Sequence, residues 1–202
     1  MIPAAEALER LIEGNRRFAS GVHGRDGLED RARRHELTAG QEPFAIILGC
    51  SDSRVPAELV FDQGLGDLFI VRVAGNVVGR EILGSLGYAL DHLRTPLFVV
   101  LGHESCGAVQ AALQIKFRRL TKPGKIAELL DAILPGLDAI DPAESAEAQW
   151  RHAVEANVFW AVRQLAATPA GAAALAEGRI RLVGAVYELA TGRVRFLPEE
   201  QP

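Results

Sequence analysis

The sequence predicts a single α/β domain built around a mainly parallel sheet, and three observations support this fold class. Short apolar segments alternate with longer segments of helical periodicity, which is typical of parallel strands connected by helices. The strand-like segments are rich in branched and aromatic residues and are bounded mostly by glycine or proline. The chain has 202 residues, 49% hydrophobic and 24% charged, which suffices for one well-filled core and makes a second independent domain unnecessary.

The first forty residues are predicted to form a helical arm, and residues 41–202 the core. The arm opens with an amphipathic helix that Gly21 ends. Its apolar residues share one face: Leu8, Leu11, Ile12 and Phe18. Residues 25–35 mix arginines with acidic residues and predict a solvated segment, helical or irregular. The opening helix has no apolar partner within its own short segment, so it could pack against a neighbouring chain.

The core is predicted to contain about four parallel strands and one antiparallel edge strand, flanked by helices. The parallel strands are expected at residues 44–49, 68–73, 97–102 and 180–187. Thr191 and Gly192 form a turn into a last strand at 194–197, which adds antiparallel to its predecessor at the sheet edge. Helices are expected at residues 78–93, 106–118, 126–134 and 143–165.

The two cysteines lie where predicted strands end. Cys50 follows the first core strand, and His103 and Cys106 follow the third. Because parallel strands present their carboxyl ends at one edge, these side chains can converge over one crevice. Two thiolates and one imidazole are a familiar ligand set for catalytic zinc, whose fourth position takes water or a displaceable carboxylate such as Asp52. The helix N-terminus at Cys106 also favours a thiolate. The sequence therefore predicts one zinc ion per chain.

Other interpretations of these residues are weaker. A disulfide between Cys50 and Cys106 is disfavoured in a reducing cytosol, and a dithiol redox centre would be expected to show a C-x-x-C arrangement. His103 and Cys106 alone would suit a capping histidine and a buried apolar cysteine, but Cys50 weakens that interpretation. Asp52 and Arg54 would suit a structural ion pair, although their place beside a zinc ligand favours catalysis.

Charge and hydropathy exclude other classes of function. The net charge of -4 lacks the basic excess that phosphate neutralisation requires, so nucleic acid is not expected as a partner. No apolar run is long enough for a signal sequence or a bilayer span. We therefore expect a soluble, cytoplasmic protein with no membrane partner.

The motifs resemble a known family. The run C-S-D-S-R at residues 50–54 and the run H-E-S-C-G at 103–107 resemble the C-x-D-x-R and H-x-x-C signatures of the β-class carbonic anhydrases. The likeness extends from the opening helix, through residues 67–76, to the C-terminal strands. It implies that Cys50, His103 and Cys106 bind zinc and that Asp52 and Arg54 form the catalytic dyad. It also implies a set of substrate-pocket residues: Gln41, Phe69, Tyr88 and Gly107.

The resemblance implies reversible hydration of carbon dioxide to bicarbonate and a proton by attack of zinc-bound hydroxide. Two thiolates weaken the Lewis acid, so better activity is expected at alkaline pH. The implied assembly is a homodimer or homotetramer in which Gln41 and Tyr88 help the site across the interface. The alternatives are a carbon disulfide or carbonyl sulfide hydrolase on the same scaffold, and a structural or sensory zinc module in which Asp52 permanently fills the fourth position.

Three residues bear on the state of this predicted site. Ile47 stands where part of the family has a tryptophan, which favours an open, water-bearing zinc, although Asp52 remains a conditional fourth ligand in a closed state. Arg72 suits either a strand-end ion pair or a place at the pocket entrance. Glu104 lies between the histidine and cysteine of the second motif and would either tune the zinc-bound water or face solvent.

Overall fold

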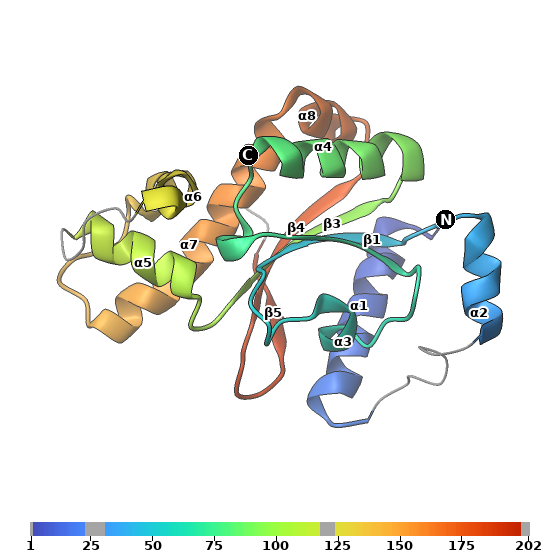
Figure 1. Cartoon of the computed structure of the whole chain (residues 1–202), viewed down its shortest axis with the longest axis horizontal. Helices are drawn as coiled ribbons and strands as arrows, with labels where there is room; N and C mark the ends of the chain where they lie inside the picture. The colour runs from blue at the N-terminus through green and yellow to red at the C-terminus, as the bar shows by residue number, and fades with distance from the viewer. Residues whose placement is uncertain (1, 23–30, 118–123, 199–202) are drawn as a thin grey trace.

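A five-stranded sheet forms the centre of the computed structural model, which describes residues 2–22, 31–117 and 124–198 (Figure 1). The strands are β1 (Ala45–Gly49), β2 (Leu68–Arg72), β3 (Leu97–His103), β4 (Arg181–Tyr187) and β5 (Val194–Phe196). Their order is β2-β1-β3-β4-β5; the first four are parallel and β5 is antiparallel to β4. The predicted sheet is confirmed, with strand ends shifted by one residue.

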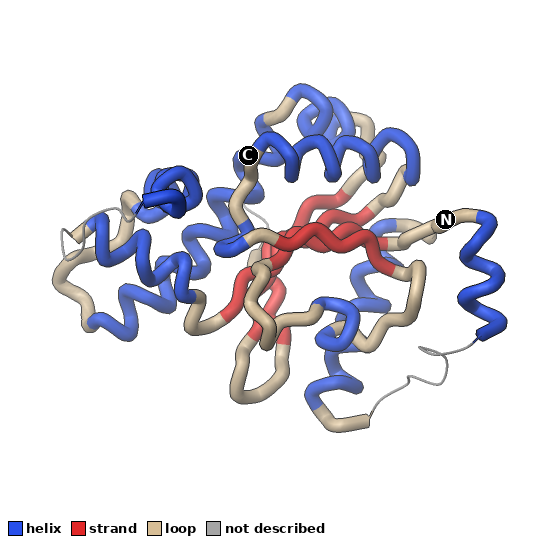
Figure 2. The backbone as a smooth tube through the Cα atoms, viewed as in Figure 1, coloured by secondary structure: helices blue, strands red, loops and turns tan. Residues whose placement is uncertain are grey.

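Helices cover both faces of the sheet (Figures 1 and 2). One face carries α1 (Ala4–Ala19) and α3 (Ala57–Val60). The other carries α4 (Arg80–Tyr88), α5 (Gly107–Lys116), α6 (Ala127–Ile133), α7 (Ala146–Ala167) and α8 (Pro169–Ala176). Successive side chains of a strand point to opposite faces, so Ile46 and Leu48 pack with the second group while Ile47 packs with the first. Burial on both faces explains the continuous apolar strands.

The predicted helices form, with different ends. The helix predicted at 78–93 is α4 followed by a π-helical turn, Ala89–Leu93. Helix α7 starts later than expected because Ser145 caps it, its side chain accepting from the amide of Ala148. Residue 118, at the end of the helix predicted at 106–118, lies outside the described residues.

The structure has further α-helices that the sequence did not predict, α3 and α8, and one, α2, in a segment predicted to be either helical or irregular. α3 is a single turn, and α8 is marked only by Thr168, which accepts from the amide of Gly171 at its start. α2 (Arg31–Glu36) is exposed and lies in the segment predicted as helical or irregular; residues 25–30 of that segment are outside the described ones.

Helix α1 packs its apolar face on its own chain, on residues outside the arm. Leu11 is fully buried in the cluster formed by α1, α3 and one face of the sheet. Asn15 donates from Nδ2 to the carbonyls of Val60 (3.0 Å) and Gly192 (2.9 Å), and its Oδ1 accepts from the amide of Val194 (2.7 Å). The partners of α1 come from distant parts of the chain, which the local sequence of the arm could not reveal.

Substituting Gly14 by alanine is expected to destabilise this packing. A Cβ at Gly14 would lie 1.8 Å from the carbonyl oxygen of Phe61, so α1 would have to move away from α3. Overpacking of this kind costs about 1–3 kcal/mol of unfolding free energy, measurable by urea denaturation. The control is Glu9→Ala in the same helix, an exposed position where alanine is a good helix former and stability should change by less than about 0.5 kcal/mol. Equal stability of the two variants would contradict the prediction.

Candidate metal centre

Cys50, His103 and Cys106 converge, as predicted, at the carboxyl edge of the sheet. One ligand atom from each lies within 4.8 Å of the others, and all three residues are buried. The two sulfur atoms are 4.0 Å apart, far beyond the length of a disulfide bond. Two thiolates bound to one tetrahedral zinc would be separated by about 3.8 Å, given zinc–sulfur bonds of about 2.3 Å. The spacing of the cysteines therefore suits zinc.

The sheet and one turn bring these residues together. β1 and β3 are parallel neighbours with Gly49 opposite Leu101, so Cys50 and His103 emerge at the same edge. Ser105 then adopts a left-handed conformation (φ 56°), which returns the chain so that Cys106 immediately precedes α5. Two elements far apart in sequence thus supply three ligands to one point.

The orientation of His103 fits a metal ligand. Its Nδ1 lies 2.8 Å from the carbonyl oxygen of Glu104, an acceptor, so Nδ1 carries the proton and Nε2 offers a lone pair. Nε2 is buried and has no hydrogen-bond partner among the described residues. A buried imidazole nitrogen without a partner is costly unless it has a ligand to bind. The donor set therefore fits a zinc ion held by Cys50, His103 and Cys106.

The pKa values of the two thiols are shifted in opposite directions. A hydrogen bond with Cys106 lowers the pKa of Cys50 against the opposing effect of burial, with smaller contributions from His103 and the amide of Gly75. The neighbouring Cys50 and burial raise the pKa of Cys106 above its usual range. The metal-free pair thus retains one proton, which a divalent cation must displace to bind both sulfurs as thiolates.

Asp52 adjoins the three ligands and is held by Arg54. Its Oδ2 lies 3.8 Å from Nε2 of His103, too far for a hydrogen bond. Arg54 donates from Nε to Oδ1 (2.9 Å), from Nη2 to Oδ2 (2.7 Å) and from its backbone amide to Oδ1 (3.0 Å). These hydrogen bonds hold the pKa of Asp52 well below its usual range. Asp52 is therefore an ionised acceptor beside the metal position.

Arg72 and Glu104, whose roles the sequence left open, both bind backbone. Arg72 donates to the carbonyls of Cys50 (3.0 Å) and Asp52 (2.6 Å), so it fixes the loop that carries a ligand and the dyad. The carboxylate of Glu104 accepts from the amide of Leu189 (3.1 Å), just after β4. The side chain of Glu104 is exposed, which confirms the interpretation that it faces solvent, and the contact with Leu189 is one that the sequence did not indicate.

Among the predicted pocket residues, only Gly107 adjoins the ligands, as the first residue of α5. Gln41 is exposed and precedes the amino end of β1, whereas Cys50 follows the carboxyl end of the same strand. Phe69 pairs in register with Ile46, also toward that end, and its ring lies 6.3 Å from that of Tyr88, centroid to centroid. A five-residue strand spans about 16 Å, so a single chain does not bring Gln41 to its own metal centre.

Sequence reasoning missed three residues that support the ligands. Asn157 in α7 donates to the carbonyl of Gly75 (2.8 Å), whose amide donates to Sγ of Cys50 (3.3 Å). Trp150, also in α7, donates to the carbonyl of Cys106 (3.1 Å). The available signal was weak: a polar residue at a buried position of a mostly apolar helix face. The first of these contacts joins residues 82 positions apart, which no local pattern indicates.

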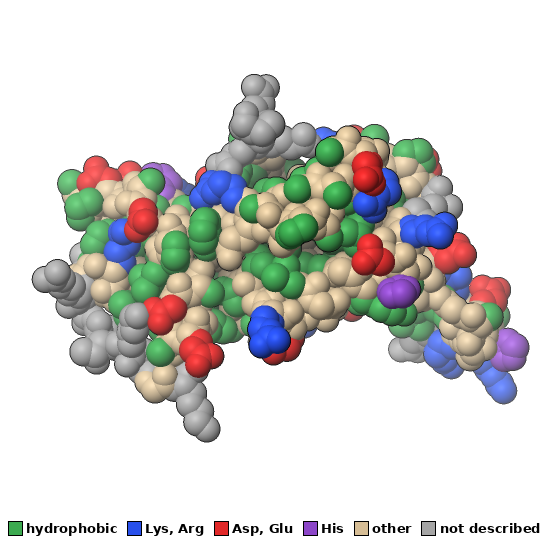
Figure 3. All heavy atoms as spheres, turned by 90° about the horizontal axis from the view of Figure 1, so that it is seen from above, with side chains coloured by type: hydrophobic (Ala, Val, Ile, Leu, Met, Phe, Trp, Pro, Cys, Tyr) green, Lys and Arg blue, Asp and Glu red, His purple; other side chains and the backbone are tan. Residues whose placement is uncertain are grey.

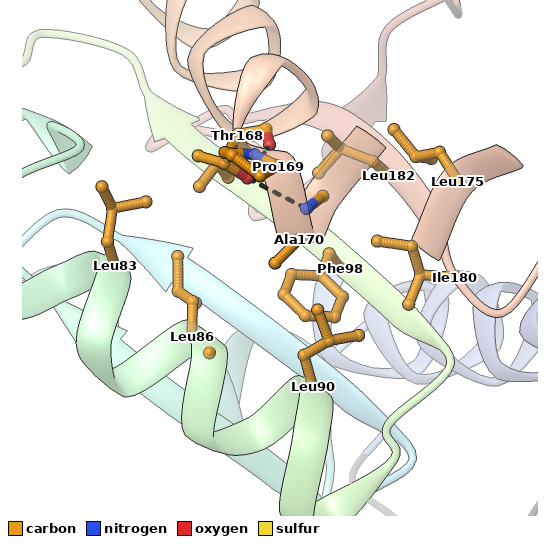
Figure 4. Close-up of a pocket in the computed structure, with 13 residues that line it drawn as sticks. Leu83, Leu86, Leu90, Phe98, Thr168, Pro169, Ala170, Leu175, Ile180 and Leu182 are labelled. Carbon is orange, nitrogen blue, oxygen red and sulfur yellow. Dashed lines mark hydrogen bonds between the residues drawn. The ribbon is translucent and has the colours of Figure 1, made fainter. Parts of the chain in front are cut away.

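An apolar cavity lies away from this centre, between α4 and α8 (Figure 4). Its volume is about 370 Å³, and none of its lining residues is a predicted ligand. Figure 3, seen from the side of α4 and α8, shows hydrophobic side chains on this face. The leucines of α4 form one wall, and residues of α8, β3 and β4 form the others.

The fold and the site together define a zinc-binding α/β protein, and comparisons with known proteins identify its family. The family model described as carbonic anhydrase matches residues 45–194. A carbonic anhydrase of Mycolicibacterium smegmatis is 42% identical over 192 residues, covering 94% of this chain and 91% of that protein. Carbonic anhydrase 2 of Mycobacterium tuberculosis is 40% identical over 197 residues, covering 93% and 89%.

A solved structure agrees with the sequence comparisons. The β-carbonic anhydrase of Coccomyxa, in complex with acetazolamide, superposes with a TM-score of 0.74 and 30% identity, covering 94% of this chain and 86% of that one. The chain belongs to the carbonic anhydrase family, in its β class. In the part of the chain that the structure describes, no helix combines the length and apolar character needed to cross a membrane.

Proposed function

We propose that the protein catalyses the reversible hydration of carbon dioxide to bicarbonate and a proton, with one zinc ion per chain. The observation that carries this proposal is the meeting of Cys50, His103 and Cys106, with Nε2 of His103 unpartnered and Asp52 beside it. Zinc in such a site lowers the pKa of a water molecule enough to supply a nucleophile near neutral pH. Membership in the carbonic anhydrase family supports the same reaction.

The dyad supplies an acceptor of fixed orientation. Because both oxygens of Asp52 are bound by Arg54, the carboxylate is ionised and cannot rotate freely. We infer that Asp52 accepts a hydrogen bond from the attacking oxygen and so orients it toward carbon dioxide. Arg54 acts through Asp52, and Arg72 holds the loop that carries both Cys50 and Asp52.

The same contacts argue against a closed, non-catalytic site. For Asp52 to ligate the metal permanently, its carboxylate would have to leave three hydrogen bonds to Arg54. A hydrolase for carbon disulfide or carbonyl sulfide would keep the metal centre, so it is distinguished only by its substrate. Neither alternative has an observation in its favour.

The test is stopped-flow carbon dioxide hydration by protein of verified zinc content, from about pH 6.5 to 9. A rate that depends on zinc and rises with pH supports the proposal. A fully zinc-loaded protein with no rate above buffer over this range would overturn it, and the same preparation would then be assayed with carbon disulfide and carbonyl sulfide.

We further propose a homodimer, alone or doubled to a tetramer, in which Gln41, Phe69 and Tyr88 complete the substrate pocket of a neighbouring chain. The support is their position: within one chain they lie toward the amino end of the sheet, while the ligands lie at the carboxyl end. Tyr88 is 48% exposed and Leu83 37%, so α4 presents apolar surface outward. Gln41 would donate its amide to an oxygen of the developing bicarbonate.

Complementation between two inactive variants tests this arrangement. Gln41→Ala and Cys106→Ala are each expected to be nearly inactive alone. In mixed dimers, the chain with intact ligands would receive an intact Gln41 from its partner. Equal mixing makes about half of the dimers mixed with one good site each, so about one quarter of wild-type activity should return. If Gln41 served the site of its own chain, mixing would restore no activity. An affinity tag on one variant, with the untagged variant detected in the purified material, would show whether mixed assemblies had formed.

We also propose a cytoplasmic location. Cys50 and Cys106 are free thiols in the structure, and thiol ligands persist most readily in a reducing compartment. Fractionation of cells, followed by detection of the protein with an antibody, tests the location directly.

A further inference from the structure

A short relay of hydrogen bonds joins the middle of α7 to a zinc ligand. The amide of Gly75 donates to Sγ of Cys50 at 3.3 Å, and the carbonyl of Gly75 accepts from Nδ2 of Asn157 at 2.8 Å. Asn157 is buried, so its amide group has no water to bond instead. Both polar groups of Gly75 are thereby committed, one to the ligand and one to the helix.

The turn at Ala74–Asn76 needs such a tether. Gly75 has a left-handed conformation with φ 69°, and a Cβ there would lie 2.8 Å from Cδ1 of Ile133. Asn76 is also left-handed, with φ 43°. Consecutive residues in this region are held by their surroundings rather than by their own preference. The hydrogen bond from Asn157 fixes the direction of the Gly75 carbonyl, which belongs to the same residue as the amide aimed at Cys50.

The same helix holds the loop of the other cysteine. Nε1 of Trp150 donates to the carbonyl of Cys106 at 3.1 Å. Trp150 and Asn157 are seven residues apart, which is about two helical turns, so they project from the same side of α7. One helix thus contacts the segment of Cys106 directly and is joined to Cys50 through Gly75, so it bears on the position of both sulfurs.

We propose that Asn157 is a positioning residue for the metal centre: it holds Gly75 so that the Gly75 amide bonds the thiolate of Cys50, and so sets zinc affinity and the charge on that sulfur. The proposal rests on the assignment of Cys50, His103 and Cys106 as zinc ligands. A hydrogen bond to a ligating sulfur withdraws charge from it and restricts its position, and losing such outer contacts typically costs about 10–100-fold in metal affinity.

The experiment compares Asn157→Ala with Gln149→Ala. Gln149 is a second buried amide of α7, and its Nε2 bonds the carbonyls of Asp141, Pro142 and Glu144, away from the ligands. Both variants lose buried hydrogen bonds of the same helix and are expected to lose stability. Zinc affinity is measured by competition with a chelator, and the sulfur-to-metal charge-transfer absorption is recorded after substitution with Co²⁺. Asn157→Leu, which is similar in size and has no donor, replaces the alanine variant if that protein does not fold.

Asn157→Ala is expected to bind zinc at least about tenfold more weakly than the wild type and to shift the charge-transfer band, while Gln149→Ala changes neither. Unchanged affinity and an unshifted band in the Asn157 variant would overturn the proposal, as would equal changes in both variants, which would mean a general loss of stability. The wild-type protein separates the two levels of inference: if it bound no zinc, the ligand assignment would fail rather than the role of Asn157.

Discussion

Replacing Cys106 by alanine is expected to remove zinc from the protein and to lower carbon dioxide hydration by at least about a thousandfold, since metal catalysis supplies several kcal/mol of transition-state stabilisation. The substitution leaves two ligands, Cys50 and His103, where three now lie within 4.8 Å of one another. It also removes the thiol whose hydrogen bond is the largest cause of the low pKa of Cys50. Metal analysis and stopped-flow hydration of the purified variant measure both effects.

A variant that loses packing alone separates metal loss from unfolding. Val109 is buried in α5, three residues after Cys106, and contributes no ligand. Val109→Ala is expected to lower stability by about 1–3 kcal/mol while keeping one zinc per chain. If Cys106→Ala retained stoichiometric zinc and full activity, the ligand set proposed for this site would be wrong.

The convergence of Cys50, His103 and Cys106 could be predicted because two simple rules apply to these residues. Each lies at the end of a strongly apolar strand, and parallel strands end at one edge of a sheet. The prediction needed only the order of strands along the chain, and the structure adds that β1 and β3 are direct neighbours. The spacing of His103 and Cys106, together with Cys50, supplied the chemistry. Local sequence patterns were therefore enough to predict that these three residues cluster.

Contacts that cross the fold could not be predicted in this way. Asn157 meets Gly75 from 82 positions away, and Asn15 meets Gly192 from 177 positions away. Both asparagines are ordinary helix residues in the sequence, and only the packing of α7 and α1 gives them partners. The same limit hid the partners of α1 within its own chain, since the surface that α1 packs on is formed by α3 and the sheet.

The predicted pocket residues show a third limit of prediction from the sequence. Gln41, Phe69 and Tyr88 were chosen through family resemblance, and a single chain leaves them toward the other end of β1 from Cys50. Their predicted role therefore depends on a second copy of the chain. Physical reasoning from one sequence describes a chain folding on itself, whereas a pocket completed by a partner has no trace in the contacts of one chain.

Replacing Asp52 by asparagine is expected to lower the rate of hydration by about 10²–10³-fold while leaving zinc bound. Asparagine keeps the shape of the side chain but offers one acceptor oxygen and a donor NH₂ in place of two acceptors. It therefore cannot both pair with Arg54 and accept a hydrogen bond from the attacking oxygen. Retained zinc with a lost rate would be the result that assigns Asp52 to catalysis, whereas a rate near that of the wild type would make the pair with Arg54 structural.

Substituting Arg54 tests the other member of the Asp52–Arg54 pair. Arg54 is the main cause of the low pKa of Asp52, so in Arg54→Ala that pKa should return toward about 3.9. A depressed carboxyl pKa contributes stability above the unfolded-state pKa that is lost as pH falls through the folded-state value, so this contribution is constant above pH 6. Asp52 thus stays ionised in both proteins throughout the assay range, and any loss of rate in Arg54→Ala reports a displaced carboxylate rather than a protonated one.

If Arg54 acts only through Asp52, the double variant Asp52→Ala with Arg54→Ala should be no slower than Asp52→Ala alone. A further loss would mean that the guanidinium acts on the substrate directly.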